Sequence, residues 1–501
     1  MKAQTAVKID TMSNNVFDRN VLSKREMFEM VDNFIQTVQV LSSEDNSPNE
    51  IDLNSIFTLI DIGLIDSESE LEWLENLLPD NVFDRLILSV NRVNCQDLMK
   101  YDDLSKYSQS FRGMKQKEEN GSGKPTLVDL FCGSGGLSLG LTQSGFRVVL
   151  ANDIEKSALR TYSFNHPEID ASKITIGGIE NIAHNVRSYI TEEVDVIAGG
   201  PPCQGFSTAN RQRIIDDPRN VLYKYYVETV KQLQPKFFIM ENVKGMKVVA
   251  DQVVEDFNNN VPVGYDISFD VLNARKLGVP QNRERLIYIG VRQDIVETNN
   301  IGAIDIINSI HANEQTELGL KVAIDSLATV EASRIKNSTE HGDEVSGYKI
   351  FKRTSSSENS YVSEINQGRE TLITYNHKAR YNNDRDIEIF GRMIPGDKSD
   401  SPRIADIMPY TSRSHMFKDK YFKLIPDVPC KTITAHMKFD CNMYIHPTQA
   451  RGLTPREAAR VQSYPDDYFF LGPYTKTYQQ IGNSVPPLMA KIIGNEIIKF
   501  L

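Results

Sequence analysis

The residue best suited to covalent chemistry is Cys203, which directly follows Gly199-Gly200-Pro201-Pro202. The apolar run 194–198 before it is typical of a buried parallel strand, and two prolines fix φ and withhold two backbone donors, so the strand must end there. Ligand sites in open α/β sheets lie beyond the carboxyl ends of the strands, where a thiolate can act as a nucleophile. A lone cysteine is more often a small buried apolar residue, so both alternatives stand at this point.

One carboxylate and two guanidinium groups are expected at the same sheet edge. Glu241 ends the apolar run 237–240, although a carboxylate in such a place is often solvated or caps a helix. Arg283 and Arg285 precede the next apolar run and, being two residues apart, point to the same side. They could form a surface salt bridge with Glu284, or they could donate to a carbonyl or phosphate oxygen.

A glycine-rich turn supplies a candidate cofactor site. Residues 126–131 predict a strand, 132–136 form the turn, and a helix is expected to start at Leu137. Asp153 ends the following strand, about 20 residues later, where an acid suits ribose hydroxyls. The turn lacks both the G-x-G-x-x-G spacing and a Gly-Lys-Ser/Thr sequence, which disfavours nicotinamide cofactors and ATP. A different nucleoside-bearing cofactor is favoured.

The elements that must position these residues follow an alternating pattern. Strands are expected at 173–176, 194–198, 236–240 and 286–291, with helices between them, notably at 220–233. Strands that alternate with helices predict a doubly wound α/β domain. Three further helical patterns with apolar stripes, at 25–41, 51–78 and 82–93, occupy the N-terminal part of the chain, and 115–124 has the composition of a linker.

The C-terminal half is less regular. Residues 296–449 lack the strand–helix alternation, and 413–438 combine basic and aromatic residues, which suits a nucleic-acid surface but is also common on a solvated face. Order returns at Thr454, where Thr454, Pro455 and Glu457 form the sequence of a capping box, and a final helix is expected at 488–500.

Composition limits the class of protein. The chain has 501 residues, is 40% hydrophobic, and contains no apolar run long enough for a membrane span and no signal-peptide core, so a cytoplasmic protein without membrane contact is expected. Its five cysteines are odd in number and form no CxxC pair, which argues against a disulfide framework and a structural zinc site. The net charge of −11 arises almost entirely in residues 1–120, so a basic face elsewhere is possible.

Taken together, the segments from about Thr126 to the C-terminus resemble the cytosine-5 DNA methyltransferase family. Six motifs occur in the family's order: 129–136 (DLFCGSGG), 201–204 (PPCQ), 241–243 (ENV), 281–285 (QNRER), 451–457 (RGLTPRE) and 480–485 (QIGNSV). The resemblance implies an α/β fold: a Rossmann-like methyltransferase catalytic domain at 121–295, a smaller target-recognition domain at 296–449, and a C-terminal segment at 450–501 that returns to the catalytic domain. Residues 1–120 would be an N-terminal helical extension.

The resemblance also implies a mechanism on double-stranded DNA. Cys203 would add to C6 of a flipped-out cytosine, Glu241 would stabilise the ring at N3, and Arg285 would donate to O2 with Arg283 in support. The methyl donor would be S-adenosyl-L-methionine. Its implied contacts are Phe131, Gly133, Gly135, Asp153, Ile154, Pro202, Leu222, Asn483 and Ser484. No metal is implied.

One position departs from the family pattern. The third strand usually leads into a Gly-Asp-Ile-like triplet whose aspartate binds the adenine amine, but here the triplet is Gly177-Gly178-Ile179. We hypothesise that Glu180 substitutes for that aspartate. The target sequence cannot be read from the chain, since specificity depends on a few side chains at base edges.

Several readings of function stay open. The favoured one is the modification enzyme of a restriction–modification system with a cognate endonuclease, or a solitary relative. An RNA-directed branch of the family methylates tRNA, but the long 296–449 stretch favours DNA. A non-catalytic DNA-binding regulator is disfavoured by the complete set of motifs, and a nicotinamide-dependent oxidoreductase by the glycine spacing. Residues 1–120 could dimerise or bind a partner, and their acidity disfavours DNA contact.

Overall fold

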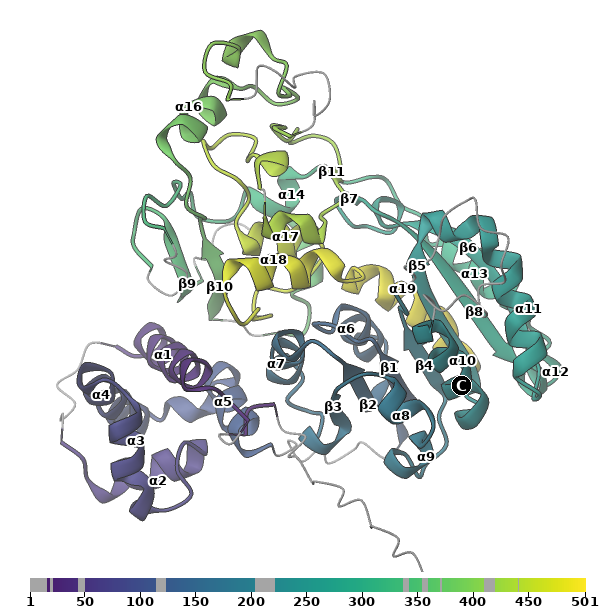
Figure 1. The fold of residues 1–501 in the computed structure, drawn as a ribbon, viewed down its shortest axis with the longest axis horizontal. Helices are drawn as coiled ribbons and strands as arrows, with labels where there is room; N and C mark the ends of the chain where they lie inside the picture. Colours follow the sequence, from purple (N-terminus) through teal and green to yellow (C-terminus); the bar gives the residue numbers. More distant parts are fainter. Residues whose placement is uncertain are drawn as a thin grey trace, which may run out of the picture.

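The computed structural model has three parts: the N-terminal helices, an α/β core that contains the main sheet, and a more irregular region that the C-terminal segment joins to the core (Figure 1). The expected linker 115–124 falls largely outside the described residues, and Cys203 falls outside them entirely. The structure describes residues 16–18, 21–43, 50–113, 123–202, 221–336, 342–353, 359–369, 372–409, 420–439 and 441–501.

The α/β core is built on a seven-stranded sheet of order β3-β2-β1-β4-β5-β8-β6. The first five of these strands are parallel, while β8 is antiparallel to both β5 and β6. The predicted doubly wound α/β fold is confirmed. The strands are β1 (Thr126–Leu130), β2 (Arg147–Asp153), β3 (Ile174–Ile176), β4 (Val196–Gly199), β5 (Phe237–Val243), β6 (Tyr265–Asn273) and β8 (Glu284–Arg292).

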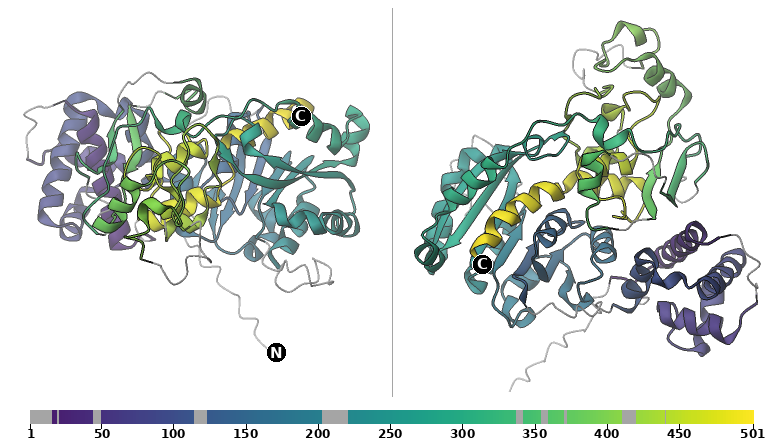
Figure 2. Two further views of the ribbon diagram at one scale, coloured as in Figure 1. Left: turned by 90° about the horizontal axis from the view of Figure 1, so that it is seen from above. Right: turned by 180° about the vertical axis from the view of Figure 1, so that it is seen from behind.

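Helices cover both faces of this sheet, because its central strands are apolar on both sides. One face packs against α6 (Gly136–Gln143), α13 (Ala303–Ala312) and α19 (Pro487–Ile497). Seen from behind, α19 lies across the sheet as the end of the chain (Figure 2). The other face packs against α8 (Glu180–Ala183), α9 (Val186–Tyr189), α10 (Val221–Leu233) and α11 (Ala250–Asn260). Because α13 contacts β6 and β8, the core layers continue past residue 295.

The N-terminal part is helical, as its apolar stripes predict, but the pattern at 51–78 divides into two helices because Gly63 ends the first of them in a left-handed conformation. It contains α1 (Lys24–Leu41), α2 (Leu53–Ile62), α3 (Leu71–Leu77), α4 (Asp80–Gln96) and α5 (Asp102–Arg112). Ser23 and Glu26 form a capping box that starts α1. The apolar cores of these helices merge with buried residues of α7 (Lys156–Asn165), including Leu159 and Phe164, so the region does not stand apart from the catalytic domain.

The irregular region contains two small sheets and short helices. Its elements are α14 (Lys321–Ile324), α15 (Ser360–Ile365), α16 (Asp384–Arg392), the pair β9 (Gly347–Lys352) and β10 (Ile373–Lys378), and the pair β7 (Gln281–Asn282) and β11 (Cys430–Lys431), whereas α12 (Gln293–Asn299) packs on β6 and β8 of the core. The segment that follows carries α17 (Pro455–Val461) and α18 (Tyr474–Asn483), and the predicted capping box of Thr454 and Glu457 is present.

The structure differs from the sequence interpretation in strand β6, which the interpretation leaves out although Tyr265, Ile267, Phe269 and Val271 alternate with polar residues as strands do. The basic and aromatic stretch 413–438 is not simply a surface: of its described residues, Tyr421 is buried, and so is Lys423, whose Nζ donates to the carbonyl of Phe390 at 2.7 Å. Burial of a lysine requires such a partner.

Candidate functional site

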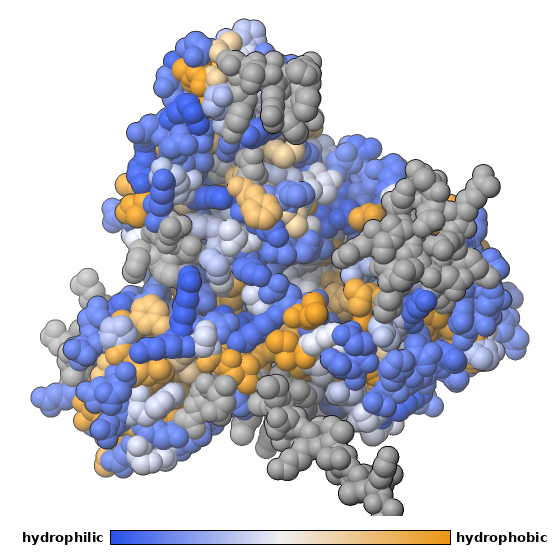
Figure 3. Space-filling view, in the orientation of Figure 1, coloured by the Kyte–Doolittle hydropathy of each residue, from blue (hydrophilic) through white to orange (hydrophobic). Residues whose placement is uncertain are grey.

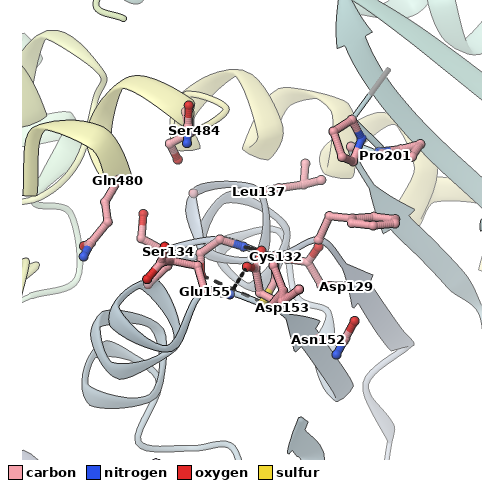
Figure 4. Close-up of a pocket in the computed structure, with 18 of the residues that line it drawn as sticks. Asp129, Cys132, Ser134, Leu137, Asn152, Asp153, Glu155, Pro201, Gln480 and Ser484 are labelled. Atoms are coloured by element: carbon pink, nitrogen blue, oxygen red, sulfur yellow. Dashed lines mark hydrogen bonds between the residues drawn. The ribbon is translucent and has the colours of Figure 1, made fainter. Parts of the chain in front are cut away.

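A cavity of about 740 Å³ opens at the carboxyl ends of β1, β2, β4 and β5. This is the place where ligands bind in open α/β sheets, and the volume suits a nucleoside-sized molecule. Figure 4 shows the wall built by the β1 loop and β2 facing Gln480 and Ser484 of the C-terminal segment, with Pro201 on the side of β4. Most predicted site residues line it: Phe131, Gly133, Asp153, Ile154, Pro202, Leu222, Glu241, Arg285, Asn483 and Ser484.

The β1 loop is shaped for close approach of a ligand. Phe131 and Gly133 have φ of +59° and +54°, a left-handed conformation that is uncommon for a residue with a side chain. A Cβ placed on Gly133 would meet no atom within 4 Å, so this glycine leaves a cradle open beside the loop. A strained residue and an open cradle together indicate a binding loop.

Asp153 ties the loop to the end of β2. Its Oδ2 accepts from the Gly133 amide at 2.8 Å, and its Oδ1 accepts from the Glu155 amide at 2.8 Å. Burial raises the pKa of the Asp153 carboxyl, against the opposing effect of these two amides. The next residue, Ile154, is 74% exposed at the cavity. A carboxylate beside an exposed apolar side chain suits a ribose next to a base.

The other two loop glycines allow the C-terminal segment to pack onto the loop. A Cβ on Gly135 would lie 2.6 Å from the hydroxyl of Tyr468, and one on Gly136 would overlap the Ser484 hydroxyl and the Val485 carbonyl. Gly135, a predicted cofactor contact, does not line the cavity, whereas Ser484 does. These glycines are required for packing between segments more than 300 residues apart.

Glu241 and Arg285 both line the cavity and contact each other. Arg285 Nε lies 2.6 Å from Glu241 Oε1, and the two side chains are 16% and 15% exposed. A Cβ on Gly200 would lie 2.8 Å from Glu241 Oε2, so the glycine lets the chain after β4 pass close to this carboxylate. Nδ2 of Asn242 donates to the carbonyl of Pro201 at 3.1 Å and fixes the loop that leads to Cys203.

Arg283 occupies a different place from Arg285. It is fully buried outside the cavity lining, and it donates to the carbonyls of Ile433 at 2.8 Å and Gly482 at 3.1 Å. Burial and the nearby Arg285 lower the pKa of the Arg283 guanidinium to about 9. The sequence predicts that the two arginines point to the same side. In the structure only Arg285 lines the cavity, whereas Arg283 joins its own strand to the segments that contain Ile433 and Gly482.

Two further residues that line the cavity, Lys476 and Asp129, have no role predicted from the sequence. Lys476 pairs with Glu155 at 3.0 Å and closes the wall between α7 and α18. Asp129 lies beneath the loop, accepts from the Ser138 hydroxyl at 2.5 Å, and has its pKa raised to about 7 by burial and by Asp153. Asp129 is the first residue of the glycine-rich motif 129–136, whereas Lys476 lies in none of the six family motifs.

Gly178 and Glu180 also line the cavity. A Cβ on Gly178 would overlap the Glu180 carboxylate, which therefore occupies the space where a side chain at position 178 would begin.

The family model for C-5 cytosine-specific DNA methylases matches residues 126–499. The chain belongs to this family. It is a DNA (cytosine-5-)-methyltransferase, so its substrate is DNA and its reaction requires a methyl donor. Among the residues that the structure describes, no helix has the length and apolar character to cross a membrane.

Individual relatives agree with this membership. The type II methyltransferase M.DdeI of Desulfomicrobium norvegicum is 33% identical over 395 residues, which cover 74% of this chain and 88% of the relative. The type II methyltransferase M.Sau96I of Staphylococcus aureus is 26% identical over 505 residues, covering 98% of this chain and 97% of the relative. A crystal structure of a DNA modification methyltransferase encoded within an E. coli prophage superposes with a TM-score of 0.58 at 25% identity, covering 75% of this chain and 99% of that one.

Proposed function

We propose that this methyltransferase transfers a methyl group from S-adenosyl-L-methionine to C5 of a flipped-out cytosine in a specific duplex sequence, through a covalent bond between Cys203 and C6. The observation that carries the proposal is the Glu241–Arg285 pair, 2.6 Å apart, in the same cavity as Pro202 and the Gly133 cradle. The chain reaches Cys203 directly after Pro202, which lines this cavity.

The residue types suit this chemistry. Addition of the Cys203 thiolate to C6 forms an S–C6 bond and moves the C5–C6 electron pair towards C5, which can then attack a methyl electrophile. Negative charge develops towards N3 and O2, where Glu241 can share a proton and Arg285 can donate. Removal of the C5 proton and expulsion of the thiolate restore the double bond. The Arg285 Nη1 group donates to the Glu284 carbonyl and Nε faces Glu241, so further N–H donors are left for O2.

The cavity residues fit S-adenosylmethionine, which supplies an electrophilic methyl group when bound. Asp153 would hold the ribose, Ile154 would contact the adenine, and Gly133 leaves room for close approach. Asn483 and Ser484 would bind from the C-terminal segment.

We further assign the adenine amine to Glu180. Its carboxylate fills the volume beside Gly178, and it lies in the cavity. Glu180→Ala should weaken cofactor binding, and Gly178→Asp combined with Glu180→Ala should restore it, because the new carboxylate takes the vacated space. Gly178→Asp alone should not help, since the two carboxylates would overlap. Titration calorimetry with S-adenosylhomocysteine measures all three, and failure of the double variant to recover would refute the assignment.

A trapping experiment tests the reaction. A duplex containing 5-fluorocytosine blocks proton removal at C5, so the covalent complex accumulates when the right site is present. Cys203→Ser should abolish the complex, and Cys95→Ser, which removes an exposed thiol in α4, should not. Full methyl transfer by Cys203→Ser would overturn the mechanism.

Transfer to total tRNA but not to duplex DNA would favour the RNA-directed reading, and DNA affinity without transfer would favour a regulator.

We also propose that the enzyme protects a site cut by a cognate restriction endonuclease, as its type II relatives suggest. Residues 296–449 would read the site. Bisulfite sequencing of DNA from cells expressing the protein should reveal one short recurrent methylated sequence. Scattered methylation without a shared sequence would contradict both statements.

A further inference from the structure

The N-terminal helices reach the cofactor side of the catalytic domain through two acidic residues of α1. Glu26 Oε2 accepts from Lys156 Nζ at 2.8 Å, and Glu29 Oε2 lies 3.4 Å from Arg160 Nη1. Lys156 is the first residue of α7 and comes three residues after Asp153. Burial raises the pKa of the Glu26 carboxyl, but the hydrogen bonds from Lys156 and Ser23 and the charge of Arg160 together outweigh it and lower this pKa to about 2. The carboxylate is therefore charged at neutral pH.

Glu29 extends the same network to two other segments. Its Oε1 lies 3.1 Å from Lys349 Nζ of β9 and accepts from the Gly472 amide at 2.9 Å. The side chains of Glu29, Arg160 and Lys349 are only 12%, 4% and 3% exposed. An ion pair of this burial is costly to break from one side, because the remaining charge stays in the protein interior.

Helix α7 is held from its other side by the C-terminal segment. The hydroxyl of Thr161 donates to Gln480 Oε1 at 2.8 Å and accepts from the Leu471 amide at 2.9 Å. Both Ser157 of α7 and Gln480 of α18 line the cavity. The cavity wall made by α7 and α18 is thus backed by α1, whose buried apolar residues form one cluster with those of α7. On the face shown in Figure 3, hydrophobic residues also lie at the surface between the N-terminal helices and the catalytic domain.

We propose that the α1 charge network, made of Glu26 and Glu29 with Lys156, Arg160, Lys349 and Gly472, positions the cofactor-binding wall. On this view the N-terminal helices α1 to α5 complete the methyl-donor site and do not form a separable partner-binding module. Glu26 and Glu29 are positioning residues, since they act through α7 and Gly472. The proposal rests on the proposed use of S-adenosylmethionine in this cavity.

The two relatives differ in how much of this chain they match. The D. norvegicum relative covers 74% of this chain, whereas the S. aureus relative covers 98% and so spans the N-terminal helices as well. A catalytic domain without the extension would need other contacts behind α7.

The test is Glu29→Gln in the full-length protein. Glutamine can still accept from the Gly472 amide, but it presents no charge to Arg160 and Lys349. We expect cofactor affinity and KM for S-adenosylmethionine to worsen by at least about tenfold, because small displacements of a binding wall have large effects, while KM for DNA and kcat at saturating cofactor stay within about twofold. Hydrogen exchange in 156–165 and 471–483 should increase.

The matched control is Asp32→Asn, on the same helix. Asp32 pairs with Arg85 of α4 at 3.4 Å and accepts from Gln36, so its loss weakens only the N-terminal helices. Cofactor affinity in Asp32→Asn should equal that of the wild type even if Tm falls. Equal cofactor affinity and equal exchange in the two variants would overturn the proposal. If the wild-type protein itself bound no S-adenosylmethionine, the proposed function would fail, and the exchange data alone would still decide whether α1 holds α7 and α18.

Discussion

Replacement of Arg285 by methionine tests how the cavity stabilises charge on the cytosine. The side chain is 16% exposed, its Nε lies 2.6 Å from Glu241, and its remaining donors are available at the cavity. Methionine keeps most of the aliphatic volume and removes the charge. The variant therefore loses the donor to O2 and leaves Glu241, itself 15% exposed, without its counter-charge.

The magnitude follows from the role of this donor. Loss of one hydrogen-bond donor to a developing oxyanion costs about 10²–10³ in rate, equivalent to about 3–4 kcal/mol. We expect the single-turnover methylation rate of Arg285→Met to fall by that factor, with DNA affinity little changed. The assay measures transfer of tritium from labelled S-adenosylmethionine to plasmid DNA from a host that lacks this modification.

Arg292→Met provides the control on the same strand. Arg292 ends β8, seven residues and therefore about 23 Å from Arg285. It pairs with Asp294 at 2.7 Å, a carboxylate that is 58% exposed, so its loss should change the rate by less than about twofold. If the two variants lost activity equally, or if Arg285→Met lost less than about fivefold, charge stabilisation by Arg285 would be refuted.

Three further predictions concern the support of the site. Asp129→Asn should flatten the pH dependence of Tm. Burial raises the pKa of Asp129 to about 7, above the value of about 3.9 for an unfolded aspartate, so stabilisation that is fully present below about pH 4 is lost as pH rises through 7. The loss is about 4 kcal/mol, asparagine removes it, and thermal melts from pH 4 to 8 would detect the difference. Arg283→Met should destabilise the protein by about 3 kcal/mol in urea unfolding, because two buried carbonyls lose a charged donor; unchanged stability would contradict the bonding described. Gly136→Ala should abolish cofactor binding in calorimetry, since its Cβ overlaps Ser484, and normal binding would show that the segment can move aside.

Much of the fold was predictable from local patterns. The apolar runs of the core predicted six of the strands, and residues such as Asp153 and Glu241 that end them were placed at one sheet edge because parallel strands share a carboxyl end. The capping box at Thr454 was equally local, since it depends on residues three apart. Strand β6 is equally local, since apolar and polar residues alternate through 265–271.

The sequence by itself thus determined which residue types meet at the sheet edge, since strand ends and turn residues act over a few positions. Only the tertiary structure decided how distant segments complete the site. It separated Arg285 from Arg283, whose partners lie 150 and 199 residues away, and it brought Glu29 to Gly472 across 443 residues. Such contacts depend on how whole elements pack, and no local pattern in Glu29 or Gly472 encodes their pairing.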